Sequence, residues 1–399
     1  MDGKHGFTRR NFVGRVGVAL GALGLRPDFD LFAQTRGQAA GAAPRARMTE
    51  NEYDALAKLA NNENPYGPPA SVMKAMEGAF KYANRYGYPD GGIVQAIADH
   101  HGVKPENIII GAGSSEILTM SDSAFLYGGK KVVSVEPTYA TIYQYATNTK
   151  SDAIKLPLRK DYGQDIPAFI RAVKENYRDV GLVYLCNPNN PTGAIVTKQE
   201  VKQLLDGIPE DVPVLIDEAY HHFIDDPSYE TSVPHVIAGR QVIVARTFSK
   251  IVGLAGMRLG YAVAPKEVIA RMRPFSQSYS VNAIVKYGGV AALKDTEAQA
   301  KVKKLNTDLR NKTTSELEGL GYEVIPSQTN FFMVHVGRDV VPVAEEFKKR
   351  GVLVGRPFPP MNQHLRVSVG SADEMNRFMT AFKEIFPAKA KATTAGVGR

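Results

Sequence analysis

Short runs of Val, Ile and Leu alternate with helix-length amphipathic segments along most of the chain, and this alternation restricts the fold more than any other feature. The runs lack the polar–apolar alternation of half-exposed strands, so they are typical of strands that are buried on both faces. Buried strands with helix-length connections predict a mainly parallel sheet between layers of helices. The predicted strands cover residues 108–110, 131–135, 180–185, 212–216 and 241–245.

The pattern changes near residue 290, where a long charged helix is expected over 296–320. Shorter strand and helix segments follow: strands at 322–324, 330–336 and 365–369, and a helix at 343–350. We therefore predict an α/β fold, with a mainly parallel sheet sandwiched by helices, and a smaller α+β domain. The expected divisions are an N-terminal arm at 43–70, a large domain at 71–289, a small domain at 290–386 and a disordered tail at 387–399.

The net charge of +8 could indicate an anionic macromolecular partner, but most of the excess lies at the two ends of the chain. Residues 1–42 contribute +3 and residues 387–399 contribute another +3, which leaves the rest nearly neutral. No basic run interleaved with aromatic residues occurs there, so nucleic-acid binding is not predicted. A single cysteine, Cys186, excludes a disulfide framework, a cysteine-based zinc site and an iron–sulfur centre, and no metal site is predicted.

Residues 1–42 have the layout of an export signal. The pair Arg9-Arg10 precedes a weakly apolar stretch that runs to Leu25, and small residues follow at 40–42. This order is typical of a signal peptide, and the arginine pair resembles a twin-arginine signal. The stretch is too short and too rich in glycine to predict a membrane span, so no stable membrane anchor is expected. We expect a periplasmic or exported protein; the alternative is an N-terminal helix or a disordered leader that contains Arg-Arg.

Polar residues follow the predicted strands, where α/β sheets bind their ligands. The first strand leads into residues 111–116 (GAGSSE), whose glycines and hydroxyl groups at a helix N-terminus favour phosphate binding. A dinucleotide site fits less well, because Glu116 stands where the third glycine would be. Asp217 ends the fourth strand, where a carboxylate needs a cation, a metal or several donors. Lys250 and Arg258 follow the fifth strand and would share this edge of the sheet.

Ten short motifs resemble, in order, those of the pyridoxal-phosphate enzymes of the aminotransferase class I/II superfamily (fold type I), most closely the histidinol-phosphate aminotransferase branch. They extend from Asn61 to Val369: NENPYGPP, RYGYPD, GAGSSE, PTY, NPNNPTG, DEAY, TFSK, GMRLG, TNF and LRVSVG. The resemblance implies the fold type I large domain and pyridoxal 5'-phosphate as cofactor. It also implies a ping-pong Schiff-base mechanism that moves an amino group between an L-amino acid or amino phosphate, histidinol-phosphate-like or aromatic, and a 2-oxo acid.

The resemblance also implies a role for each candidate residue. Lys250 would form the Schiff base and carry the proton during the reaction. Asp217 would keep the pyridine nitrogen protonated, and Tyr139 would stack on the ring. Arg366 would pair with the substrate carboxylate through its guanidinium fork. The remaining implied contacts are Asn190 and Tyr220 to the phenolic oxygen of the ring, Ser114, Ser115, Thr247, Ser249 and Arg258 to the phosphate, Glu116 among the other cofactor-binding residues, and Asn64 among the substrate-binding residues.

Two departures from the family pattern concern the partner subunit and the substrate. Tyr88, or alternatively Tyr86, would reach the phosphate of a neighbouring subunit, which implies a homodimer with shared sites. The choice stays open because this chain reads RYGYPD where relatives usually have RYPD. Relatives that bind histidinol phosphate typically place an arginine directly after the strand of GVLV, whereas here Gly355 comes before Arg356.

His221 and His222 could line the pocket or be packing residues.

Two alternatives remain beside the aminotransferase hypothesis. The first is a lyase, decarboxylase or cyclase, because the same fold also carries these enzymes. The second is a non-catalytic binding protein, and the intact set of Lys250, Asp217, Arg258 and Arg366 argues against it.

Overall fold

The computed structural model describes residues 48–149 and 151–388. The predicted signal peptide and residues 389–399 of the predicted tail lie outside the described residues. Residues from Glu50 onward belong to one compact unit, which contains two separate sheet systems. We call these the large domain, built on the seven-stranded sheet, and the small domain, built on the shorter sheets.

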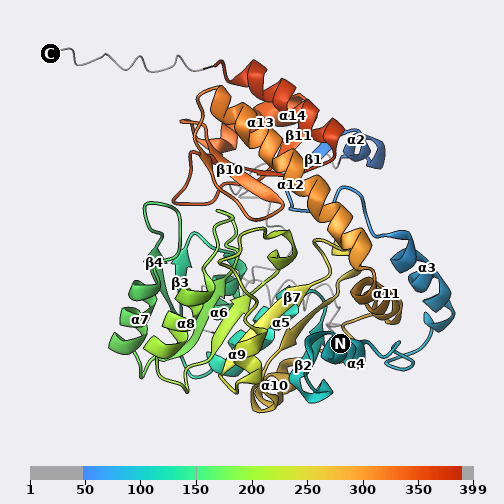
Figure 1. Cartoon of the computed structure of the whole chain (residues 1–399), viewed down its shortest axis with the longest axis vertical. Helices are drawn as coiled ribbons and strands as arrows, with labels where there is room; N and C mark the ends of the chain where they lie inside the picture. The colour runs from blue at the N-terminus through green and yellow to red at the C-terminus, as the bar shows by residue number, and fades with distance from the viewer. Residues whose placement is uncertain (1–47, 150, 389–399) are drawn as a thin grey trace, which may run out of the picture. The chain divides into compact units, whose positions relative to one another are not determined.

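The large domain has a central sheet of seven strands in the order β2-β8-β7-β6-β5-β3-β4 (Figure 1). All neighbouring pairs are parallel except those of β8, which runs antiparallel to both β2 and β7. The predicted mainly parallel sheet is thus confirmed. The strands are β2 (Ile108–Gly111), β3 (Lys131–Glu136), β4 (Ala153–Pro157), β5 (Val180–Cys186), β6 (Val214–Asp217), β7 (Val242–Thr247) and β8 (Gly260–Val263).

Both faces of this sheet are buried, because alternate side chains of each strand enter different apolar cores. In β6, for example, Val214 and Ile216 belong to one core and Leu215 to the other. Figure 1 shows the helices flanking the sheet. The first core contains side chains from α3 (Ala70–Ala79), α4 (Ile93–His101), α7 (Ile166–Glu175), α8 (Lys198–Gly207), α9 (Val233–Ile237) and α11 (Ala283–Lys294). The second contains side chains from α5 (Ser114–Phe125), α6 (Thr141–Asn148) and α10 (Lys266–Met272).

The small domain has its own apolar core and an antiparallel sheet in the order β12-β10-β9. Its elements are α12 (Thr296–Gly319), β9 (Val324–Ile325), β10 (Phe331–His335), α13 (Val340–Lys349), β11 (Val352–Val354), β12 (His364–Ser368) and α14 (Ala372–Ile385). The long helix expected over 296–320 is confirmed as α12. One part of the predicted arm differs from expectation. After α2 (Glu50–Asp54), the chain forms β1 (Ala57–Leu59), which pairs in parallel with β11 and so belongs to the small domain.

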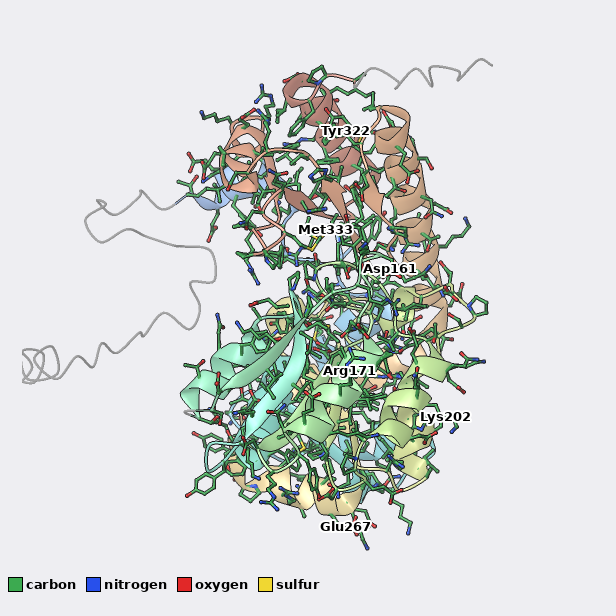
Figure 2. The ribbon with its side chains drawn as sticks, turned by 90° about the vertical axis from the view of Figure 1, so that its left-hand side faces the viewer. Asp161, Arg171, Lys202, Glu267, Tyr322 and Met333 are labelled. Carbon is green, nitrogen blue, oxygen red and sulfur yellow. The ribbon has the colours of Figure 1, made fainter. Side chains whose placement is uncertain are left out.

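The two sheet systems meet at a small apolar cluster. Leu158 and Tyr162, from the loop after β4, pack against Met333 and Phe358 of the small domain. Figure 2 labels Asp161 of that loop and Met333 at this boundary. Within the part of the chain that the structure describes, no helix has the length and apolar character needed to cross a membrane.

Candidate active site

A cavity lies at the carboxyl ends of the central strands, where parallel strands of this sheet converge. Its walls come from the start of α5 and from the segments that follow β3, β5, β6 and β7. Ten sequence-predicted residues line it: Ser114, Ser115, Tyr139, Asn190, Asp217, Tyr220, Thr247, Ser249, Lys250 and Arg258. The structure therefore brings together groups that are spread over 145 positions of the chain.

Lys250 extends from the segment after β7 into this cavity. Its Nζ donates a hydrogen bond to the Asn61 carbonyl at 3.2 Å and lies 5.6 Å from the ring centroid of Tyr220. Burial, together with the nearby guanidinium of Arg366, lowers the pKa of Lys250 to about 8. Because only the neutral amine is a nucleophile, this environment leaves a useful fraction of reactive amine near neutral pH.

Asp217 is the last residue of β6 and is almost fully buried. One carboxylate oxygen accepts from the Tyr184 hydroxyl at 3.0 Å, and the other accepts from the Ala219 backbone N–H at 3.1 Å. Burial raises the pKa of Asp217 to about 6, so the group is mostly ionised at neutral pH. A buried carboxylate that has two donors and, within the described part of the chain, no ion pair is suited to a cationic nitrogen of a bound ring.

The opposite end of the cavity is built for an anion. Helix α5 begins at Ser114, so its first N–H groups and its dipole favour negative charge. Gly113 adopts φ +81°, and a Cβ there would lie 2.2 Å from Arg258 Nη2, so only glycine leaves room for this arginine. The Thr247 hydroxyl donates to the Ser249 hydroxyl at 2.9 Å. Arg258 itself holds the rarely populated φ of +59°, a strain that proteins tolerate mainly at functional sites.

Arg366 approaches the cavity from the small domain, on β12. One of its Nη atoms donates to the Asn190 side-chain oxygen at 2.8 Å, and among the described residues its Nε has no hydrogen-bond partner. The guanidinium carbon lies 4.6 Å from the ring centroid of Phe358. Burial lowers the pKa of Arg366 to about 10, which leaves it charged at neutral pH with donor capacity to spare.

Besides Arg366, three predicted residues do not line this cavity. The Glu116 carboxylate accepts from the Ala112 N–H at 2.6 Å and from the Ser280 hydroxyl at 2.7 Å, so it braces the loop before α5, and its cofactor contact stays a prediction. The Asn64 amide donates to the Ile251 carbonyl at 2.9 Å and so holds the segment after Lys250. Tyr88 is 82% exposed and does not line the cavity of its own chain.

His221 and His222 also lie outside the cavity lining. Burial and the neighbouring Arg246 cation lower the pKa of His222 to about 3, so it packs as a neutral ring. Arg246 is paired with Glu218 at 2.8 Å, and both side chains are buried. The packing interpretation of the two histidines therefore holds.

Sequence reasoning missed several residues at the site. Asn61, Glu63 and Cys186 line the cavity, and Tyr184 supports Asp217 from the neighbouring strand. Glu63 belongs to the NENP motif and Asn61 directly precedes it, so the motif was a usable signal. Tyr184 lies two residues before the end of its strand and gave no sequence signal of its own. Among the described residues, no group of three or more His, Cys, Asp or Glu side chains could hold a metal ion.

Comparison with known proteins agrees with this geometry. A model of the family described as aminotransferase class I and II matches residues 55–382. The chain belongs to this family. The histidinol-phosphate aminotransferase of Moorella thermoacetica is 37% identical over 335 residues, which cover 82% of this chain and 85% of that relative. The histidinol-phosphate aminotransferase of Brevibacillus brevis is 34% identical over 338 residues, which cover 82% of this chain and 90% of that relative.

A solved structure gives the same result for the fold and the cofactor. The crystal structure of histidinol-phosphate aminotransferase from Sinorhizobium meliloti, in complex with pyridoxal-5'-phosphate, has a TM-score of 0.77 and 26% identity. The matched region covers 88% of this chain and 98% of the Sinorhizobium meliloti chain. The predicted fold type I architecture, transaminase activity and pyridoxal phosphate cofactor are thus confirmed.

The cavity of this aminotransferase fits pyridoxal phosphate on its own chemistry. The α5 N-terminus, the hydroxyl pair and Arg258 form a cradle for a phosphate, and a Cβ at Gly113 would fill it. Asp217 would supply a buried negative charge for the ring nitrogen, and Lys250 would supply the amine between the two ends. When bound, the cofactor supplies an electron sink for chemistry at the substrate carbon.

Proposed function

We propose that this aminotransferase moves an amino group between an amino phosphate of the histidinol-phosphate type and a 2-oxo acid. The observation that carries the proposal is a pair of guanidinium groups on one aromatic ring. The guanidinium carbons of Arg356 and Arg366 lie 4.3 Å and 4.6 Å from the ring centroid of Phe358. The buried cation of Arg366 and the half-buried cation of Arg356, beside the lysine-bearing cavity, favour substrates with a strong anionic group. The relatives named as histidinol-phosphate aminotransferases support the same substrate class.

The residues of the chain divide the work in this proposal. Lys250 would bind the cofactor and carry a proton between its Nζ and the substrate carbon. Asp217 would hold its charge against the ring nitrogen, and Tyr139 would pack against the ring face. Arg366 would give up its hydrogen bond to Asn190 and form two hydrogen bonds to the substrate carboxylate instead.

Amino transfer can be tested directly on the purified holoenzyme. L-Histidinol phosphate, L-phenylalanine and L-aspartate are each supplied with 2-oxoglutarate, and glutamate formation is measured. We expect the highest kcat/KM with histidinol phosphate and no glutamate from the Lys250→Ala variant. Release of carbon dioxide or ammonia without glutamate would instead support the decarboxylase or lyase alternative. A preference for L-phenylalanine over histidinol phosphate would refute the substrate proposal alone.

We also propose a homodimer in which Tyr88 completes the site of the partner subunit. Phe80, Tyr86, Tyr88 and Tyr279 are all more than 60% exposed, an unusual concentration of aromatic surface that favours burial in an interface. Tyr86 and Tyr279 already contact each other, with ring centroids 5.3 Å apart, whereas Tyr88 stays available.

The dimer proposal predicts complementation between two inactive chains. Lys250→Ala and Tyr88→Ala subunits are mixed under conditions that exchange subunits, and activity is compared with that of each parent. In the mixed dimer, one site has both residues intact, so activity is expected to reappear. An active monomer in light scattering, or no recovery after verified subunit exchange, would contradict the shared site.

Finally, we propose that the protein is exported by the twin-arginine route and acts in the periplasm. The support is the sequence of residues 1–42 alone: Arg9-Arg10, a weakly apolar stretch and small residues near 40–42. Cell fractionation should find a shortened protein in the periplasm, and replacing Arg9 and Arg10 by lysine should retain the full-length chain in the cytoplasm. A wild-type protein that is uncleaved and cytoplasmic would refute export.

A further inference from the structure

The Tyr220 hydroxyl in the cavity wall receives two side-chain amides. Asn62 Nδ2 donates to it at 3.0 Å, and Asn190 Nδ2 donates at 3.4 Å. A phenolic oxygen accepts two hydrogen bonds and donates one. Since both acceptor positions are taken by amides, the hydroxyl hydrogen of Tyr220 has to point elsewhere, and Tyr220 borders the cavity.

Ser368 determines which way the Asn62 amide faces. The Ser368 hydroxyl accepts from the Asn62 backbone N–H at 2.8 Å and donates to the Asn62 side-chain oxygen at 2.9 Å. In this arrangement the backbone N–H takes one acceptor position of the Ser368 hydroxyl, and the hydroxyl hydrogen points at the Asn62 side-chain oxygen. The NH₂ end of Asn62 is therefore the end that meets Tyr220.

The small domain holds Asn62 in this position. Asn62 is 1% exposed and adopts φ +55°, a conformation that asparagine tolerates better than most residues. Its carbonyl accepts from the Asn330 amide at 3.0 Å. Ser368 stands two residues after Arg366 on β12, so both side chains leave the same face of that strand. One strand thus carries the proposed carboxylate contact and the support of the Tyr220 hydroxyl.

We propose that Asn62, oriented by Ser368, is a positioning residue that makes Tyr220 a one-way hydrogen-bond donor toward the phenolic oxygen of the cofactor. The inference rests on the proposed function and on the contact between Tyr220 and the phenolic oxygen of the cofactor that the family resemblance implies. A donor at that oxygen stabilises its negative charge, so the lysine–cofactor linkage loses its proton at a lower pH. Two amides that donate to the Tyr220 oxygen polarise its O–H bond and strengthen this donation.

The test is a pH titration of the absorption band of the bound cofactor. Asn62→Gly removes the amide donor and accepts the positive φ without strain, so it preserves the backbone. The midpoint is expected to rise by about half a pH unit, the size that a weakened neutral hydrogen bond supports. Ser368→Ala should also raise the midpoint, but by less than Asn62→Gly does, because the Asn62 amide remains and is only free to turn.

Asn107→Ala is the matched control. The Asn107 amide donates to the Ala264 carbonyl at 2.9 Å, just before β2 and at the end of that strand farther from Gly113. Its loss should leave the midpoint unchanged. An unchanged midpoint in cofactor-loaded Asn62→Gly would overturn the inference, and so would an equal shift in Asn107→Ala. If Asn62→Gly does not fold by circular dichroism, the midpoint of Ser368→Ala decides. A wild-type protein without a cofactor band would contradict the proposed role of Lys250 instead.

Discussion

Asp122 gives the sharpest test of the energetics of this structure. It lies on α5, the helix whose N-terminus forms the phosphate cradle, and its side chain is fully buried. Among the described residues, neither carboxyl oxygen has a hydrogen-bond partner. Burial in these apolar surroundings raises the pKa of Asp122 to about 8, so the native protein holds this group mainly protonated at neutral pH.

The perturbation is Asp122→Asn, which keeps the shape of the side chain but cannot ionise. In wild type the folded pKa lies above the unfolded value, so folding takes up a proton and stability falls as pH rises from about 4 to about 8. A difference of about four pKa units corresponds to at most roughly 5 kcal/mol above pH 8. The asparagine side chain does not ionise, so the variant does not lose this unfolding free energy as pH rises. We therefore expect similar stabilities near pH 4 and a variant that is several kcal/mol more stable near pH 8.5.

The assay is urea unfolding followed by far-UV circular dichroism between pH 4 and pH 9, with the transition midpoints compared at equal slopes. Asp99→Asn makes the same chemical substitution at an exposed position of α4 and should not reproduce the effect. If the gap between Asp122→Asn and wild type does not widen as pH rises, Asp122 is not held neutral in the native state and the reasoning is refuted.

Three further predictions follow from the site and its surroundings. Gly113→Ala should weaken cofactor binding without unfolding the protein, because the new Cβ meets Arg258 Nη2 at 2.2 Å; equilibrium dialysis of pyridoxal phosphate measures this. Arg246→Ala should lower stability by about 3–5 kcal/mol in urea unfolding, since it leaves the buried Glu218 charge without its partner. In cofactor-free protein, the rate of pyridoxal phosphate attachment to Lys250 should rise about tenfold per pH unit and level off above a pH of about 8, as stopped-flow absorbance would show.

The predictable part of the fold was the part with the strongest local pattern. The five predicted strands are runs rich in Val and Ile that lie in a sheet covered on both faces, so their composition was sufficient. β8 was not predicted, and its antiparallel direction depends on pairing with β2 and β7 rather than on its own sequence. β1 has three residues, and its place beside β11 comes from a contact almost 300 positions away.

The candidate site was predictable in its chemistry and less so in its orientations. Strand ends located Asp217 and Lys250, because sheet topology brings these ends together. Glu116 lies outside the cavity lining because its side chain folds back to the Ala112 amide, a local rotamer choice that a motif does not show. Asn62 was missed because its significance depends on Ser368, which stands 306 positions later in the chain.

The strand pleat also explains how two adjacent acids keep different roles. Asp217 and Glu218 are consecutive, so their side chains leave opposite faces of the sheet. The buried cation Arg246 lies on the face of Glu218 and neutralises that acid alone. Asp217 accepts hydrogen bonds from two neutral donors, and the charge of Lys250 on the cavity side favours its ionised form. Among the described residues Asp217 has no direct ion pair like the one that neutralises Glu218, so its carboxylate would be able to meet a cationic cofactor nitrogen.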